Sequence, residues 1–250
     1  MRKIIRSIFF VIVGVFVGLI LYEVVMFGRV WRLRSNNPQS TSLIDTRLSE
    51  AEAAGKTPRR EQTWVGLDQI SPNLQRAVLA GEDTNFVTHH GFDYEALQKA
   101  WDEGMREATR EAKKEGEDDD WLPTIPDFKR GASTVSQQLA KNLYLSSQRS
   151  FFRKGQEAFI TIFLERTLTK KRILEIYLNV IEWGDGIYGA EAAAQHYFHK
   201  SASALSANEA AFLSAMIPNP RTVFNPQVNP RRVSRRQRII LRGMPRVQIP

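Results

Sequence analysis

The chain opens with a basic segment, residues 1–6, followed by a long apolar run over residues 7–28. Residues 7–22 carry no charge, and Glu23 is the one acid of the run. As a helix the run is roughly 33 Å long, enough to cross a hydrocarbon core of about 30 Å. A cleaved signal peptide and a buried core helix are the alternatives, but no Ala-x-Ala site follows, and the run lies at the extreme N-terminus. The pattern therefore predicts a transmembrane signal anchor that keeps the basic residues in the cytoplasm and exports the rest.

The remaining chain reads as one domain with appendages. Residues 29–63 are polar and predict a tether with one helix at about residues 43–54. The domain proper is predicted over residues 64–225, and residues 133–215 show helical spacing almost throughout, with one clear loop at 184–189. Strand signals are weak everywhere, so the fold class is mainly α.

Two helix starts are well marked. Ser71 followed by Pro72 predicts a helix that runs to Glu82. Thr134 followed by Gln137 fits a capping box. In this second helix the apolar side is expected to hold Val135, Leu139 and Leu143, and the polar side Thr134, Gln138, Lys141 and Leu145. Free N–H groups and a cation on one face suit a phosphate-bearing ligand, although a solvated polar stripe is the alternative.

Charge is distributed unevenly around the formal net value of +8. Residues 94–127 hold 11 acidic and 5 basic side chains, and residues 102–120 predict a charged, solvated, helix-prone insertion. Residues 226–250 are predicted to be a basic tail, since residues 231–250 contain seven arginines and no acid. A nucleic-acid arm lacks the expected aromatic residues, which favours attraction to anionic lipid head groups. The absence of cysteine excludes thiol chemistry.

Several ordered blocks carry the candidate chemistry. They are Glu-Asp-x-x-Phe-x-x-His-x-Gly at residues 82–91, Gly-Ala-Ser-Thr-Val-Ser-Gln-Gln at 131–138, Arg-Lys-Gly-Gln-Glu at 153–157, and the helical and glycine-containing segments 164–179 and 183–200. In this order they resemble the glycosyltransferase domain that polymerises lipid II, found in class A penicillin-binding proteins and in monofunctional biosynthetic peptidoglycan glycosyltransferases. The resemblance covers about residues 64–220. It implies a mainly α, lysozyme-like catalytic lobe with a small membrane-facing lobe.

The resemblance also assigns site residues. Glu82 matches the general base that deprotonates the acceptor hydroxyl, and Glu157 matches a second catalytic glutamate. The reaction implied is an inverting transfer that forms β-1,4 glycan strands and releases undecaprenyl diphosphate. The residues matching the diphosphate-binding cluster are Lys141, Arg149, Arg153 and Lys154. Those matching the polar donor site are Ser133, Thr134, Gln137 and Gln138, and those expected to shape the cleft are Asp83, Phe86 and His89.

The sequence leaves alternatives to that function. A lysozyme-like lytic enzyme acting on finished peptidoglycan needs an acid but no cationic cluster, and a membrane-tethered scaffold needs neither. We find no Ser-x-x-Lys or Lys-Thr-Gly, the marks of a transpeptidase, so the chain is expected to be monofunctional. Adjacent His89 and His90 lack the further ligands of a zinc site.

Expected partners are lipid II, the growing lipid-linked glycan chain, the membrane and other cell-wall synthesis proteins, but no nucleic acid. No cofactor is obligatory and no metal site is evident, although a divalent cation (Mg or Mn) could bridge the diphosphate. The expected location is the bacterial inner (cytoplasmic) membrane, crossed once, with the N-terminus cytoplasmic and the catalytic domain periplasmic or extracytoplasmic.

Overall fold

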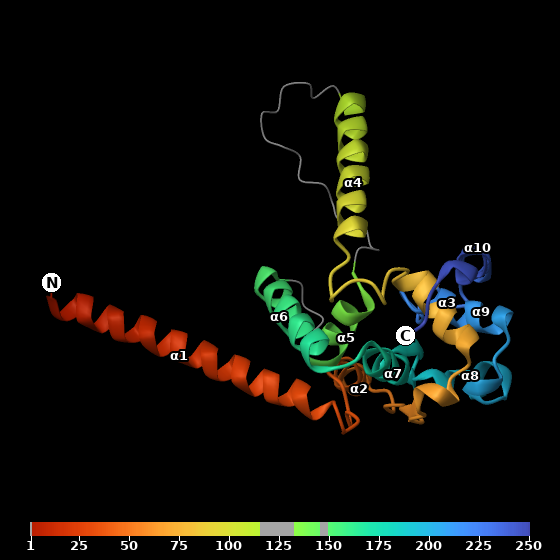
Figure 1. The fold of residues 1–250 in the computed structure, drawn as a ribbon, viewed down its shortest axis with the longest axis horizontal. Helices are drawn as coiled ribbons and strands as arrows, with labels where there is room; N and C mark the ends of the chain where they lie inside the picture. Colours follow the sequence, from red (N-terminus) through yellow and green to blue (C-terminus); the bar gives the residue numbers. More distant parts are fainter. Residues whose placement is uncertain (1, 116–132, 146–149) are drawn as a thin grey trace.

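The computed structural model describes residues 2–115, 133–145 and 150–250 (Figure 1). Helices dominate these ranges, which confirms the mainly α class. The α-helices are α1 (Arg2–Arg32), α2 (Ser42–Ala53), α3 (Pro72–Glu82), α4 (Tyr94–Glu115), α5 (Val135–Tyr144), α6 (Phe151–Thr167), α7 (Lys170–Val180), α8 (Ala190–Phe198), α9 (Ala207–Met216) and α10 (Pro230–Gly243).

Helix α1 leaves the body of the molecule as a long, isolated rod (Figure 1). Its segment Ile4–Arg32 is the one described helix long and apolar enough to span a membrane, and the most apolar part of it has no buried residue. The end nearest the body differs, because Met26 and Val30 are buried and Phe27 packs edge-on against Phe163 of α6 at 5.5 Å between ring centroids. The predicted N-terminal anchor helix is therefore present, and it extends past residue 28.

Residues 29–63, predicted to be a tether, fold in large part onto the domain. Helix α2 matches the predicted 43–54 within one residue, and its Ile44 is fully buried. Strand β1 (Glu61–Gln62) pairs in parallel with β3 (Ile187–Tyr188). Strand β3 pairs antiparallel with β2 (Glu182–Gly184), which gives the sheet order β1-β3-β2. The predicted loop at 184–189 thus contains a strand.

Residues 226–250 belong to the folded domain, contrary to the predicted tail. Helix α10 packs against α9 and α3, and its Val233 and Ile240 are buried. Gly81 makes this packing close, because a Cβ there would lie 2.8 Å from Ser214 Oγ and 3.2 Å from Ile240 Cδ1. The tail prediction was wrong because most of the arginines occupy the outer positions of an amphipathic helix, whose buried apolar positions hold it on the domain.

The acidic insertion begins as an ordered helix. Helix α4 projects away from the body and runs across the direction of α1 (Figure 1). Its Tyr94, Leu97 and Trp101 are exposed. Residues 116–132 of the predicted 94–127 insertion and its surroundings lie outside the described residues.

The core connects helices from both ends of the body. Helix α5 lies against α2, α6 and α7, while α3 lies against α9 and α10. The fully buried side chains of this continuous core include Leu74, Leu139, Leu164, Ile173 and Trp183. Burial of such large apolar side chains stabilises a fold by about 1.5–3 kcal/mol each. The core fixes the ends of α3 and α5 relative to each other, where the polar residues of the next section meet.

Candidate active site

Helix α3 delivers Glu82 to the site. Ser71 caps the helix by accepting a hydrogen bond from the Asn73 N–H, and Pro72 is the first helical residue, as predicted. Glu82 is the last residue of α3, and its side chain is only 9% exposed. One carboxylate oxygen, Oε1, accepts from Arg236 Nη2 at 2.7 Å, and the other, Oε2, accepts from Gln138 Nε2 at 3.0 Å. The carboxylate at the end of α3 is therefore held by side chains from α5 and α10.

The environment of Glu82 acts on its pKa in two directions. Burial is the largest influence and raises the pKa of Glu82 above its ordinary value. Arg236, the Gln138 amide and Lys141 oppose this rise by favouring the ionised form. The result is a carboxylate that is more basic than a surface glutamate, which is the property that a general base requires.

The start of α5 is fixed by its own side chains. Thr134 Oγ1 accepts from the Gln137 N–H, and the Gln137 side chain accepts from the Thr134 N–H, which confirms the capping box. Thr134 also donates to Gly91 O at 2.7 Å. Thr134 and Gln137 thus use their side chains within the fold, whereas Gln138 faces Glu82. The apolar side predicted for this helix is buried as expected, but Leu145, predicted on the polar side, is buried too.

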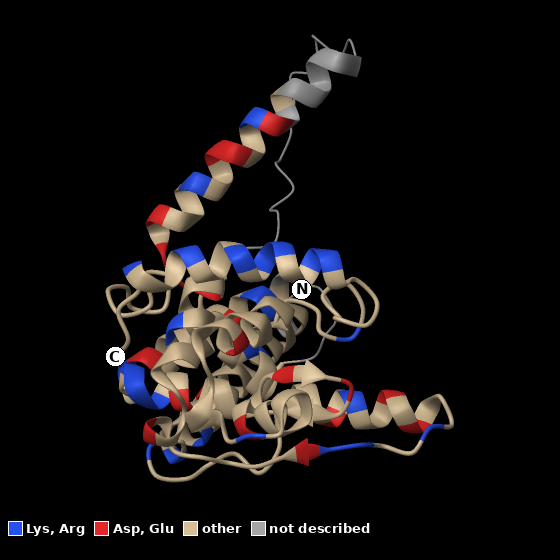
Figure 2. Cartoon of the chain, turned by 90° about the vertical axis from the view of Figure 1, so that its right-hand side faces the viewer, with Lys and Arg blue, Asp and Glu red and all other residues tan. Residues whose placement is uncertain are grey.

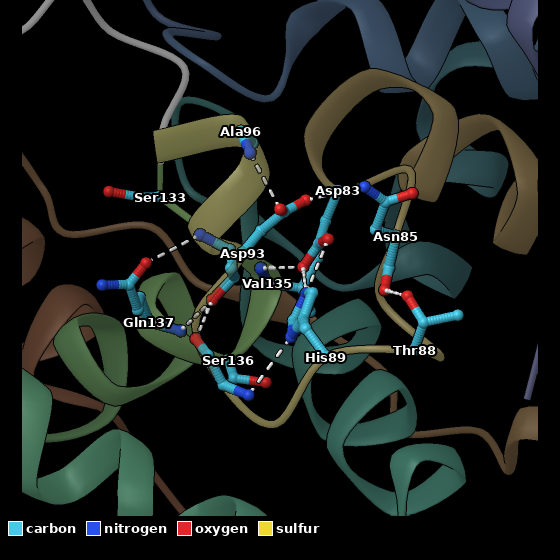
Figure 3. Close-up of polar contacts among 12 residues, drawn as sticks. Asp83, Asn85, Thr88, His89, Asp93, Ala96, Ser133, Val135, Ser136 and Gln137 are labelled. Atoms are coloured by element: carbon cyan, nitrogen blue, oxygen red, sulfur yellow. Dashed lines mark hydrogen bonds and ion pairs between the residues drawn. The ribbon is translucent and has the colours of Figure 1, made fainter. Parts of the chain in front are cut away.

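Asp83 ties the loop after α3 to the N-terminus of α5 (Figure 3). Its Oδ1 lies 2.9 Å from His89 Nε2, and its Oδ2 accepts from the Val135 N–H at 2.8 Å. The other ring nitrogen of His89, Nδ1, accepts from the Gly91 N–H at 3.1 Å. Since Nδ1 accepts, Nε2 carries the proton and donates to Asp83. Both ring nitrogens are occupied, so His89 has a positioning role here.

The cations of α6 surround a buried carboxylate. Arg153 Nη1 donates to Glu157 Oε2 at 2.9 Å, and Lys154 forms a short ion pair with Oε1 of the same side chain. Glu157 is 3% exposed, whereas the Lys154 side chain is 53% exposed. The predicted shared helix face of these three residues is therefore present. The Nε of Arg153 is buried and makes no hydrogen bond within the described residues.

Lys141 connects the two carboxylates. It interacts electrostatically with Glu82 on one side and with Glu157 on the other. Desolvation by the surrounding protein is the largest influence and lowers the pKa of Lys141, Glu157 opposes it, and Arg153 and Lys154 lower the pKa further. The Lys141 side chain is nonetheless exposed to solvent. Glu82, Lys141 and the α6 cluster thus converge.

The sequence has counterparts among known proteins. A sequence model of the transglycosylase family matches residues 50–116 and 122–245. The chain belongs to the transglycosylase family. It is 43% identical over 231 residues to a biosynthetic peptidoglycan transglycosylase of Laribacter hongkongensis, covering 92% of this chain and 93% of the relative. It is 41% identical over 249 residues to a protein of the same name from Herminiimonas arsenicoxydans, covering 99% and 100%.

The family match extends the transglycosylase domain beyond the predicted 64–225. It takes in part of α2 and all of α10, in agreement with their packing. The match is interrupted at residues 117–121, within the predicted acidic insertion.

The structure also places two other predicted site residues, Phe86 and Ser133. Phe86 is fully buried, with Lys170 Nζ 4.4 Å from its ring centroid. The Ser133 carbonyl accepts from Gln138 Nε2 at 3.3 Å, which places its backbone beside the Glu82 contact. Arg149 lies outside the described residues. Among the residues that are described, no group of three or more His, Asp or Glu side chains could hold a metal.

Arg236 and Tyr177 are the site residues that sequence reasoning missed. Arg236 of α10 contacts both Gly81 O, at 2.9 Å, and Glu82. Arginines are dense over residues 231–250, and nothing in their spacing distinguishes the inward Arg236 from its outward neighbours, which line the exposed side of α10 (Figure 2). Tyr177 of α7 lies outside the predicted site residues, and its hydroxyl donates to Gln138 Oε1.

Proposed function

We propose that this transglycosylase polymerises lipid II into linear β-1,4 glycan strands by inverting transfer, with release of undecaprenyl diphosphate. The observation that carries the proposal is the convergence of Glu82 with Lys141 and the Arg153–Lys154–Glu157 cluster. A base for a hydroxyl and a set of cations for a departing diphosphate are the two requirements of this chemistry. The family membership and the names of the relatives support the same reaction.

In this mechanism Glu82 accepts the proton of the C4 hydroxyl of the acceptor lipid II. The hydroxyl oxygen attacks the anomeric carbon of the donor chain from the face opposite the diphosphate. The bond from that carbon to the diphosphate breaks, and the α-linkage becomes a β-linkage. Each Glu82 oxygen accepts one hydrogen bond from the protein and has capacity for another, so the carboxylate can receive the hydroxyl proton without losing its supports.

The leaving diphosphate gains negative charge as the glycosidic bond breaks. Lys141, Arg153 and Lys154 supply positive charge that is already in place, which stabilises the transition state without reorganisation. Arginine can bind a phosphate through two donors, and lysine acts as a point charge. Glu157 orients Arg153 and Lys154 through its two oxygens. Arg149 is assigned to the same cluster by the resemblance.

The test is polymerisation of labelled lipid II by the purified full chain. Glu82→Gln keeps the shape of the side chain but replaces one accepting oxygen with an NH₂ group and removes the base, and we expect glycan formation to fall by about 10²–10⁴-fold. Glu52→Gln, on the exposed side of α2, is the matched control and should keep the wild-type rate. Polymerisation by Glu82→Gln at the wild-type rate would disprove the assignment of the base.

The lytic alternative is separated by the substrate. A lysozyme-like enzyme acts on finished glycan and has no use for the cations around Glu157. We expect labelled finished glycan to stay intact under conditions in which lipid II is consumed. Release of soluble fragments, without polymer from lipid II, would favour the lytic function.

A divalent cation is proposed as an optional bridge between the diphosphate and the enzyme. The buried carboxylate of Glu157 is already neutralised by Arg153 and Lys154, so the cluster itself can bind a diphosphate directly. Polymerisation with and without a chelator, followed by addition of Mg²⁺ or Mn²⁺, measures whether the cation contributes to the rate.

We further propose that α1 crosses the bacterial inner membrane once. The exposed apolar surface of Ile4–Arg32 supports this, and the basic residues before the apolar run favour a cytoplasmic N-terminus. The catalytic domain would then lie in the periplasm, beside its lipid-linked substrates and other cell-wall synthesis proteins. Protease added to spheroplasts should digest the catalytic domain, whereas digestion only after lysis would reverse the orientation.

A further inference from the structure

Two consecutive hydrogen bonds connect the core to Glu82. Tyr177 of α7 donates its hydroxyl proton to Gln138 Oε1 at 2.8 Å, and Gln138 Nε2 donates to Glu82 Oε2 at 3.0 Å. Tyr177 is fully buried, so water cannot replace it as the partner of the amide oxygen. These two hydrogen bonds connect α7 through α5 to the end of α3.

The donor and acceptor roles in these two hydrogen bonds are fixed by the chemistry of the groups. An ionised carboxylate only accepts hydrogen bonds, so the Gln138 amide must turn its NH₂ group toward Glu82. The amide oxygen then faces Tyr177, which must donate. Burial raises the pKa of Tyr177 well above its ordinary value, and Glu82 and Asp83 raise it further, so the hydroxyl keeps its proton throughout the working pH range.

Without the Tyr177 hydroxyl, the Gln138 amide oxygen loses its hydrogen-bond donor, and only the contacts of Nε2 with Glu82 and the Ser133 carbonyl remain to orient the amide. A rotated amide would bring Oε1 against the Glu82 carboxylate, replacing a donor with a second acceptor. The charged groups that act on Glu82 would remain, namely Arg236 from α10 and Lys141 from α5. Loss of the Gln138 donor therefore leaves the ionised form of Glu82 less stable than before.

We propose that Tyr177 is a positioning residue for catalysis, which holds the Gln138 amide in the one orientation that supports Glu82 as an ionised base. This inference rests on the proposed function, because it concerns the general base of the same reaction. It assigns a catalytic consequence to a core tyrosine that has no contact with the substrate.

The test is the pH dependence of lipid II polymerisation by Tyr177→Phe in the full chain. We expect the acid limb of the rate profile to move up by about one pH unit, which is about a tenfold loss of rate on that limb, with a smaller change on the plateau. Tyr197→Phe is the matched control, since it removes a tyrosine hydroxyl that donates to Trp183 O at 3.0 Å, away from Glu82. In this control the acid limb of the rate profile should stay at the wild-type pH.

A double-mutant cycle shows whether Tyr177 acts through the amide. Gln138→Met removes the amide, and we expect it to move the acid limb as Tyr177→Phe does. Adding Tyr177→Phe to Gln138→Met should then shift the limb no further. A wild-type limb for Tyr177→Phe, or an equal additional shift in the Gln138→Met background, overturns the inference. Should Tyr177→Phe fail to fold, an unmoved limb in Gln138→Met alone overturns it.

The outcomes also separate this inference from the proposed function. If the wild-type chain makes no polymer, or Glu82→Gln polymerises normally, the proposed function fails. If both behave as proposed and the Tyr177→Phe limb does not move, only the positioning role fails.

Discussion

The contact between Arg236 and Glu82 provides the most direct test of how this site tunes its base. Replacing Arg236 with Met removes a guanidinium 2.7 Å from a carboxylate oxygen and keeps much of the apolar volume of the side chain. Burial already raises the pKa of Glu82, and Arg236 is the largest of the influences that lower it. The substitution should therefore raise the pKa of Glu82 further.

The size of the effect follows from the distance and the exposure. Two unit charges about 4 Å apart attract by about 4 kcal/mol at an effective dielectric constant of 20. The Arg236 side chain is 27% exposed, so solvent screens part of this attraction. An opposite charge at such a distance typically shifts a carboxyl pKa by about 1–3 units. We expect the lower half of that range, about 1–2 units, which is about 10–100-fold in rate on the acid limb.

The assay is the polymerisation rate of lipid II across pH. In Arg236→Met the acid limb should move to higher pH, and the rate should recover as the pH rises and Glu82 ionises. Arg238→Met, an exposed arginine on the same helix, is the matched control and should leave the limb in place. A rate that falls equally at every pH would mean that Arg236 acts on structure or on binding, and the reasoning about the base would be refuted.

Further predictions concern stability and are measured by unfolding in detergent. Thr134→Val removes the cap of α5 and should lower the free energy of unfolding, measured in urea, by about 1–2 kcal/mol. Thr134→Ser keeps the capping hydroxyl and should retain most of this stability. An equal loss in both variants would contradict the role of the cap. Asp83→Asn weakens the contacts to His89 and the Val135 N–H and should cost about 1–3 kcal/mol, so an unchanged midpoint would argue against them. Contacts with Lys200 and Ser206 lower the pKa of Glu209 to about 2, so ionised Glu209 stabilises the fold above pH 4.5 and this effect is lost as the pH falls toward 2. Glu209→Gln should therefore reduce the dependence of the melting temperature on pH in this range. An unaltered dependence would be the contrary result.

Features governed by neighbouring residues could be predicted from the sequence. The capping box of α5, the start of α3 at Ser71 and the boundaries of α2 depend on contacts within a few residues, and all three are confirmed. The long apolar run is recognisable for the same reason, since its signal is continuous. The family blocks supplied the candidate site because they place Glu82 and Glu157 without any knowledge of the fold.

Features that depend on distant contacts were missed. Arg236 and Glu82 are 154 positions apart, and only the packing of α10 against α3 brings them together. The arginines of α10 have the same chemistry in the sequence, so their charge pattern could not show which one turns inward. Likewise, the polar character of residues 29–63 concealed a strand, because β1 is two residues long and is stabilised by its partner β3.

The adjacent acids Glu82 and Asp83 show how one turn of chain can serve both the base and the scaffold. Helix α3 ends at Glu82, and the backbone of Asp83 is extended, with φ −163° and ψ 79°. This change of conformation sends Asp83 to the first N–H group of α5, while Glu82 meets Gln138 one turn further along the same helix. Asp83 therefore acts together with the core to hold the start of α5 at the end of α3, where Gln138 reaches Glu82. The base and its donor are held by a contact that itself takes no part in the transfer.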